Sequence, residues 1–215
     1  MTSDLAVLTR QFLEYLEVER NCSRLTVRNY QHYLSVLIEY LQNELKRAPV
    51  VDDINQDSIR SFRLFLSRQP GTIGDLKSVT QGYYVICLRS FLKWCVKNDL
   101  KVMAPEKLEV PKNKDHSLKF LDEEQMKRLL NQPLLSSKTG LRDKAILELL
   151  FSTGLRVSEL VSLDSDKIDL KTREFGVIGK GGKQRVVFIS HQAAEFVDRY
   201  LKSRTDKRKP LFLRM

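Results

Sequence analysis

Several features that define whole classes of protein are missing from this 215-residue sequence. No apolar run approaches the ~18 residues that a membrane-spanning helix needs, and residues 1–10 lack the basic-then-apolar order of a signal peptide. The three cysteines, Cys22, Cys87 and Cys95, are an odd number, far apart and without a C-x-x-C pair. These absences argue against a membrane protein, a disulfide scaffold and a zinc knuckle, and predict a protein of the reducing cytoplasm.

The signatures of several enzyme classes are missing as well. The sequence holds no H-E-x-x-H, no G-x-S-x-G and no Walker A loop, so zinc peptidases, α/β-hydrolases and P-loop enzymes have no support. Asp164, Asp166 and Asp169 resemble an acidic metal loop but lack the glycine and glutamate of a calcium site. We therefore expect neither a metal nor another cofactor.

Positive charge is plentiful. Lys and Arg number 37 against 27 Asp and Glu, which gives a net charge of +10 and a pI near 9.5. Residues 117–215 hold 20 basic and 13 acidic residues, and residues 1–116 hold 17 and 14. Such a balance fits an anionic partner, with nucleic acid first, although ribosomal and membrane-surface proteins have similar compositions.

Helical spacing of apolar residues dominates the first half of the chain. It predicts helices over about 4–19, 24–46 and 78–98, and a further helix capped by Asn55 or Asp57. Residues 104–117 contain two prolines and three lysines among few apolar positions. We interpret them as a linker between a helical domain, residues 1–103, and a second domain, residues 118–215.

The second half mixes helices with a hairpin. Asp122 and Gln125 are spaced as a capping box, and helices are expected over about 141–152, 157–163 and 191–204. Two β-prone segments, 174–179 and 184–189, flank a glycine-rich turn. The expected fold is therefore mainly α, with a small β-hairpin in an α+β second domain.

One pattern that suits phosphate chemistry is Thr153-Gly154-Leu155-Arg156-Val157-Ser158-Glu159-Leu160. Gly154 has the character of a helix-ending glycine, and Arg156 then stands at a helix N-terminus, where anions are favoured. Its planar fork of donors suits two phosphate oxygens, and Glu159 lies one turn on, placed to hold it. Taken alone, the pattern fits a helix-turn-helix with a surface Arg–Glu pair at least as well.

A second pattern is Gly179-Lys180-Gly181-Gly182-Lys183-Gln184-Arg185 at the tip of the hairpin. Glycines allow a tight turn and a close approach to a ligand, and a lysine there reaches a DNA backbone or a leaving oxygen. An ordinary turn with solvated charges is the alternative. Between Lys202 and Lys209 lies a basic cluster that is either a solvated face or a phosphate contact.

Taken together, the motifs resemble the tyrosine recombinases of the phage-integrase superfamily, in particular the Xer type. The resemblance covers the whole chain, and the motifs in their order along the chain are more specific than any one motif alone. Its segments are Ser23-x-x-Thr26-x-x-x-Tyr30, Arg142-Asp143-Lys144-Ala145-Ile146, Thr153 to Leu160 and Ile178-Gly179-Lys180-Gly181. It implies a SAM-like, core-binding helical domain followed by part of a catalytic domain.

The resemblance also implies a chemistry. In that family a tyrosine attacks a phosphate of double-stranded DNA, forms a 3′-phosphotyrosine and frees a 5′-hydroxyl, without a metal. Arg156 matches the first arginine of the pocket and Lys180 the proposed general acid. Glu159 matches the acidic support of that arginine, while Lys183 and Arg185 are expected on the DNA backbone. The complete family member is expected to clamp DNA and to act as a tetramer on paired sites.

One departure from the family is large. The family needs an H-x-x-R box and a later nucleophilic tyrosine, but His32, His116 and His191 lead to Ser35, Lys119 and Ala194. Tyr200 is the only tyrosine after Lys180 and is interpreted as structural. We therefore expect the chain to lack the C-terminal part of the catalytic domain and its nucleophile, and not to cleave DNA alone.

Two further interpretations stay open. The chain is alternatively a DNA-binding module or regulator that occupies recombination sites without cleaving them. A transcription factor that uses residues 154–163 as a helix-turn-helix is the third interpretation, and it gives Lys180 no role.

Overall fold

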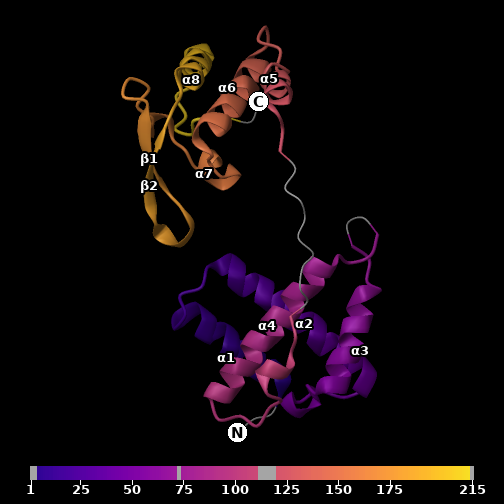
Figure 1. The fold of residues 1–215 in the computed structure, drawn as a ribbon. Coiled ribbons are helices and arrows are strands. Elements are labelled where there is room, and N and C mark those ends of the chain that lie inside the picture. Colours follow the sequence, from indigo (N-terminus) through magenta and orange to yellow (C-terminus); the bar gives the residue numbers. More distant parts are fainter. Residues whose placement is uncertain (1–3, 72–73, 111–119, 214–215) are drawn as a thin grey trace. The chain divides into compact units, whose positions relative to one another are not determined.

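The computed structural model describes residues 4–71, 74–110 and 120–213, apart from the side chain of Lys180. The chain divides into two compact units, unit 1 over residues 1–116 and unit 2 over residues 117–215 (Figure 1). Helices dominate both units, and the only sheet among the described residues is a two-stranded hairpin. The predicted fold class is confirmed. None of the described helices is long and apolar enough to cross a membrane.

Four helices form unit 1: α1 (Leu5–Val18), α2 (Arg24–Leu45), α3 (Gln56–Ser67) and α4 (Ser78–Lys97). Short polar side chains start three of them by accepting backbone N–H groups, with Asp4 at the start of α1. Ser23 caps α2 through the N–H of Thr26 at 3.2 Å, and Asn55, one of the two predicted caps, starts α3. The Ser23 and Thr26 of the family motif thus do the work of a helix cap.

Aromatic side chains fill the core of unit 1. The ring of Phe12 lies 5.5 Å from Phe91 and 5.7 Å from Trp94, centroid to centroid. Cys87 and Cys95 are fully buried between the helices, and burial raises the pKa of Cys95 to about 12, so both remain packing thiols.

The first part of the predicted linker packs on this core. Pro105 begins a short 3₁₀ turn and is buried, as is Leu108. Residues 111–117 of the predicted linker lie outside the described residues. The domain bounds 1–103, 104–117 and 118–215 therefore stay a prediction.

Unit 2 joins four helices to the hairpin. The helices are α5 (Glu123–Leu130), α6 (Lys138–Thr153), α7 (Val157–Val161) and α8 (His191–Ser203), and the strands are β1 (Glu174–Ile178) and β2 (Gln184–Phe188). Helices α6 and α8 pack side by side (Figure 1). The strands run antiparallel, with Phe175 opposite Val187 and Val177 opposite Arg185, and this face of the hairpin turns toward the core.

Local capping explains the helix starts of unit 2. The predicted capping box is present: Gln125 donates its backbone N–H to Asp122 at 2.8 Å, and Asp122 donates to the Gln125 side chain at 3.1 Å. Helix α6 begins at Lys138, before the predicted residue 141, because the Ser137 hydroxyl accepts the backbone N–H of Gly140 at 3.0 Å. Hydrophobic spacing alone does not reveal this first turn.

A buried ion pair links three helices of unit 2. The Lys144 ammonium on α6 lies 2.8 Å from the Glu148 carboxylate and donates to the carbonyl of Leu130 at 2.7 Å. Gln192 of α8 donates to the same carboxylate at 3.1 Å. Both charged side chains are less than 5% exposed, so the pair fixes α5 and α8 against α6.

Candidate phosphate-binding site

The turn between α6 and α7 sets the position of Arg156. Gly154 adopts φ +61°, a left-handed conformation that a glycine reaches without strain, and its N–H donates to the Leu150 carbonyl at 2.9 Å. Leu155 is then buried, and Arg156 stands at the start of α7. The predicted helix end at Gly154 is confirmed.

Glu159, in the first turn of α7, holds this turn in place. Its Oε2 accepts the backbone N–H of Arg156 at 2.8 Å, and its Oε1 accepts Nη1 of the Arg156 side chain at 2.9 Å. Glu159 is only 7% exposed, whereas the Arg156 side chain is 61% exposed. The structure therefore contains the Arg156–Glu159 contact that the spacing suggests.

A second arginine reaches the same carboxylate from the hairpin. Arg185 on β2 donates Nη1 to Oε1 of Glu159 at 2.9 Å and Nη2 to Oε2 at 2.8 Å. This bidentate pair is the main cause that lowers the pKa of Glu159 to about 2, aided by the Arg156 backbone N–H. One carboxylate thus ties the α7 turn to the hairpin.

Sequence reasoning placed Arg185 on the DNA backbone and missed this pair. Strand alternation carried the signal, because Arg185 lies two residues before the buried Val187 and so shares the inward face of the hairpin. Contact with DNA stays a prediction for Arg185, whose guanidinium is here engaged by Glu159.

The glycine-rich turn begins beside this pair. The backbone N–H of Gly179 donates to the Lys183 carbonyl at 2.7 Å, and Gly181 and Gly182 have φ values of +76° and +74°. A Cβ on Gly179 would lie 3.1 Å from Nη1 of Arg185, tighter than ordinary contact. Lys180 follows directly; its backbone belongs to the turn, and its side chain is outside the described part of the structure.

Arg156 keeps donors available to a ligand. Only Nη1 binds Glu159, and within the described residues its Nε and Nη2 have no protein acceptor. Lys183 is exposed and also lacks an acidic partner there. No group of described residues is composed to hold a metal ion. The site can therefore donate to the oxygens of an anion from a fixed arginine beside a lysine-bearing turn.

Tyr200 has no part in this site. Its ring is fully buried and stacks on Phe212, with the centroids 5.4 Å apart, and its hydroxyl accepts the backbone N–H of Leu213 at 3.2 Å. The structural interpretation of Tyr200 is confirmed.

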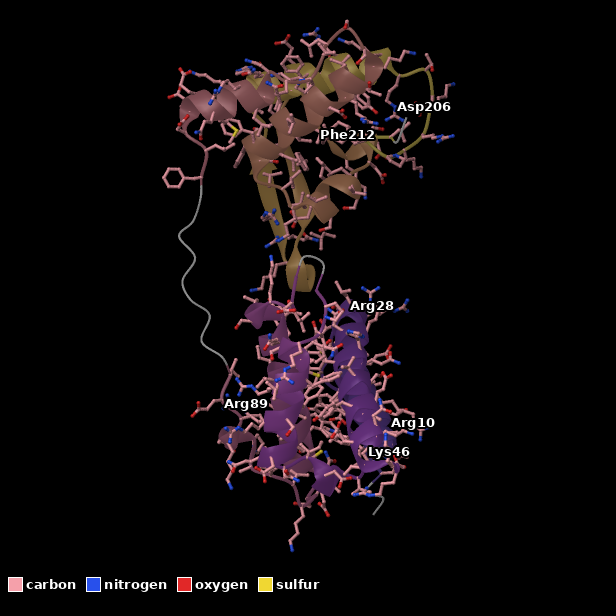
Figure 2. The ribbon with its side chains drawn as sticks, turned by 90° about the vertical axis from the view of Figure 1, so that its right-hand side faces the viewer. Arg10, Arg28, Lys46, Arg89, Asp206 and Phe212 are labelled. Carbon is pink, nitrogen blue, oxygen red and sulfur yellow. The ribbon has the colours of Figure 1, made fainter. Side chains whose placement is uncertain are left out.

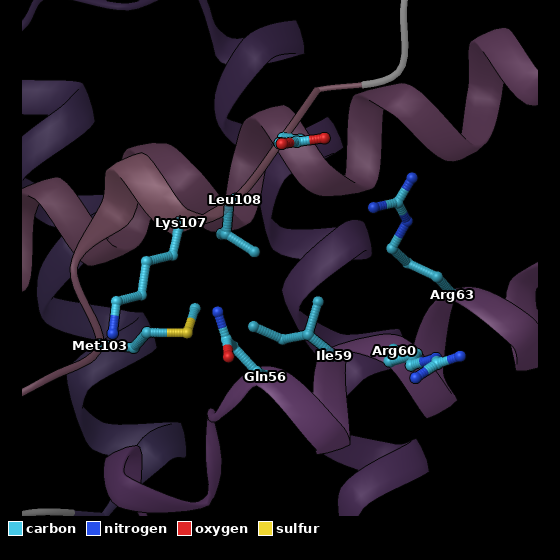
Figure 3. Close-up of a pocket in the computed structure, with 8 residues that line it drawn as sticks. Gln56, Ile59, Arg60, Arg63, Met103, Lys107 and Leu108 are labelled. Atoms are coloured by element: carbon cyan, nitrogen blue, oxygen red, sulfur yellow. The ribbon is translucent and has the colours of Figure 1, made fainter.

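Unit 1 carries two basic hollows of its own. One, of about 350 Å³, is lined by the cations Arg20, Lys93 and Lys97 together with aromatic rings. The other, of about 260 Å³, has Arg60, Arg63 and Lys107 on its walls (Figure 3).

Comparison with known proteins covers both units. Residues 119–215 match the model described as the phage integrase family, and residues 9–99 match the phage integrase N-terminal SAM-like domain. Tyrosine recombinase XerC of Escherichia coli strain K12 is 34% identical over 204 residues, which is 93% of this chain. The chain spans 64% of the length of that relative.

Solved structures share the fold. The Tn1549 transposon integrase in complex with circular intermediate DNA aligns with a TM-score of 0.72 at 16% identity, over 99% of this chain and 72% of that one. The XerH site-specific recombinase bound to its difH substrate aligns with a TM-score of 0.62 at 19% identity, over 96% and 61%.

Proposed function

Because the chain belongs to the phage integrase family of tyrosine recombinases, with the Xer type as its relatives, we propose that it acts in site-specific DNA recombination. It binds double-stranded DNA and supplies one part of the pocket in which strands are cut and rejoined through a 3′-phosphotyrosine. The observation that carries this proposal is the Glu159 carboxylate, which holds Arg156 and the hairpin of Lys180 together.

Each residue of the site has a physical task. Arg156 neutralises the non-bridging oxygens of the attacked phosphate, where negative charge grows as the phosphorane forms. Lys180 delivers a proton to the 5′-oxygen that leaves. Glu159 and Arg185 act through Arg156 and Lys180 as positioning residues, and Lys183 contacts the DNA backbone.

The attacking tyrosine is the part that this sequence does not provide. Unit 2 has a single tyrosine, Tyr200, and that side chain is fully buried. We expect this 215-residue polypeptide to form no covalent adduct with a nicked recombination site. The full activity then requires an H-x-x-R arginine and a tyrosine from elsewhere, in a tetramer on paired sites.

The three free cysteines favour a cytoplasmic location.

Salt dependence of DNA binding tests the proposal. If about five phosphates are neutralised, log affinity falls against log salt with a slope of roughly −4 to −5. Arg156→Ala removes one phosphate contact and lowers the magnitude of that slope by about 1. Arg128→Ala removes an equal charge from an exposed position on α5 and serves as the matched control. Absent or salt-independent binding contradicts the proposal.

A double-mutant cycle separates the roles of Arg185. As a positioning residue it acts through Arg156, so Arg185→Ala costs little further affinity in an Arg156→Ala background. As an independent phosphate contact, it lowers the magnitude of the slope by a further ~1 in both backgrounds. Arg185→Lys retains the charge but not the bidentate pair, and therefore weakens binding only if positioning matters.

A DNA-binding module that occupies recombination sites is the second candidate, and the buried Tyr200 favours it. An adduct assay on nicked DNA separates the two only when the H-x-x-R arginine and the tyrosine are also supplied, since a recombinase pocket completed in this way traps the 3′-phosphate and a binding module does not. The helix-turn-helix interpretation gains ground instead if Arg156→Ala and Lys180→Ala leave binding unchanged while substitutions at Val157 and Val161 alter base preference.

A further inference from the structure

The segment that follows α8, residues 204–211, is a loop built around one arginine. The Arg204 side chain is only 5% exposed. Its Nη1 donates to the carbonyls of Pro210 at 2.8 Å and Leu211 at 3.1 Å, and its Nη2 donates to the carbonyl of Arg208 at 2.7 Å. A single guanidinium thus satisfies three backbone carbonyls and gives the loop a fixed shape.

Asp206 completes this scaffold. It binds Nη2 of Arg204 at 2.6 Å and Nε at 3.2 Å, and it accepts the backbone N–H of Arg208 at 2.9 Å. The contact with Arg204 is the main cause that lowers the pKa of Asp206 to about 2. Arg204 and Asp206 cancel each other's charge inside the loop.

The C-terminal end of the loop is anchored to the segment that follows α7. Ser165 donates its N–H to the Lys209 carbonyl at 2.8 Å, and the N–H of Leu211 donates to the Leu163 carbonyl at 2.7 Å. Leu211 is fully buried. Figure 2 shows the loop between the end of α8 and Phe212, with Asp206 labelled at its outer edge.

The scaffold presents three consecutive cations, Lys207, Arg208 and Lys209, which we call the 207–209 triad. All three are exposed, and none of them forms an ion pair within the described part of the chain. Asp164 and Asp166, on the adjoining segment, form no salt bridge with them there. Cations on a pre-shaped backbone lose less conformational entropy on binding an anion than cations on a flexible tail.

We propose that the 207–209 triad is a second contact of unit 2 with the phosphodiester backbone of DNA, independent of base sequence. The inference rests on the proposed function, because it requires that the chain binds duplex DNA. Backbone phosphates are the fitting partner, since they offer a row of single negative charges along one edge. Helix α7, five residues with about 8 Å of helix rise, and a short turn separate Arg156 from Leu163, the first anchor of the loop.

The first experiment measures the salt dependence of duplex binding for the variant K207A/R208A/K209A. At roughly 0.9 per phosphate, loss of three contacts lowers the magnitude of the slope by about 2 to 3. The matched control is R128A/K138A/K171A, which removes three exposed cations elsewhere in unit 2 and leaves the slope within about 1 of the wild type.

The second experiment separates the shaped loop from bulk charge. Asp206→Ala keeps the whole 207–209 triad and raises the net charge by one, so electrostatics alone predicts tighter binding. Loss of the scaffold predicts the opposite, a binding constant weaker by about 3- to 10-fold. Circular dichroism shows whether α8 and the rest of unit 2 keep their fold.

The outcomes are distinct. A steep salt dependence of the wild type, with the triad variant indistinguishable from its control, overturns this inference and leaves the proposed function intact. Tighter binding by Asp206→Ala overturns it as well. A wild-type chain that does not bind duplex DNA overturns both.

Discussion

The two units of this chain differ in the kind of side chain that stabilises the interior of each. Among the described residues of unit 1, the buried side chains are apolar apart from Thr9. In unit 2 the buried set includes Lys144, Glu148 and Glu159. Regular helices satisfy their own backbone, so unit 1 needs only shape and hydrophobicity. Unit 2 must fix turns and a hairpin, and it does so with charged groups that reach across the chain.

The comparison predicts a pure packing loss in unit 1. Phe91 is fully buried, and its ring lies 6.0 Å from that of Trp94. Phe91→Ala leaves a cavity and lowers the free energy of unfolding by about 4 kcal/mol. Trp94 is the only tryptophan, so its fluorescence during urea unfolding reports unit 1. Hydrogen exchange in α6 should stay unchanged, and loss of protection there would contradict separate cores.

In unit 2 the matching change is electrostatic. Lys144→Met leaves Glu148 buried without its cation, which lowers the free energy of unfolding of unit 2 by about 3 kcal/mol. Hydrogen exchange in α6 and α8 accelerates, while the urea midpoint of Trp94 fluorescence stays in place. The double variant K144M/E148L removes both charges and regains most of the loss; if it does not, the pair stabilises by more than mutual neutralisation.

Acid is expected to weaken unit 2 before unit 1. In unit 2 the pKa values of Glu159 and Asp206 are lowered to about 2, and backbone N–H groups lower the pKa of Asp169. In unit 1 the Arg47 guanidinium lowers the pKa of Asp53. A carboxylate whose pKa is lowered by folding stabilises the folded state at pH values above its unfolded pKa, which is near 4. This stabilisation is lost as the pH falls toward 2. Between pH 5 and pH 2, the stability of unit 1 should therefore fall less than that of unit 2. Thermal melts followed by Trp94 fluorescence report unit 1, and hydrogen-exchange protection in α7 and the hairpin reports unit 2.

Much of the fold was predictable because its signals are local. Apolar spacing predicts the long helices, and the capping box at Asp122 and the helix end at Gly154 depend on residues within one turn. The ordered motifs also pointed to the family, which the comparisons confirm. What local patterns specify, the structure reproduces to within a few residues.

The contacts of unit 2 between residues far apart in the sequence were not predictable in this way. Arg185 meets Glu159 across 26 positions of sequence, and Arg142 donates to the Leu213 carbonyl across 71. From sequence alone, a charged residue is predicted to lie at the surface. Only the fold shows which face of its strand or helix turns inward. Lys144 and Arg204 illustrate this, since both belong to charged stretches and both are buried in the fold.

The shared carboxylate also sets the net charge of the site. Two guanidinium groups around one Glu159 carboxylate leave a surplus of one positive charge, which equals the single negative charge of a DNA phosphodiester. A five-coordinate phosphorane carries one negative charge more, and a protonated Lys180 would match it. Under the proposed function, the net charge of this cluster would balance the phosphodiester, and Lys180 would balance the charge that the phosphorane adds.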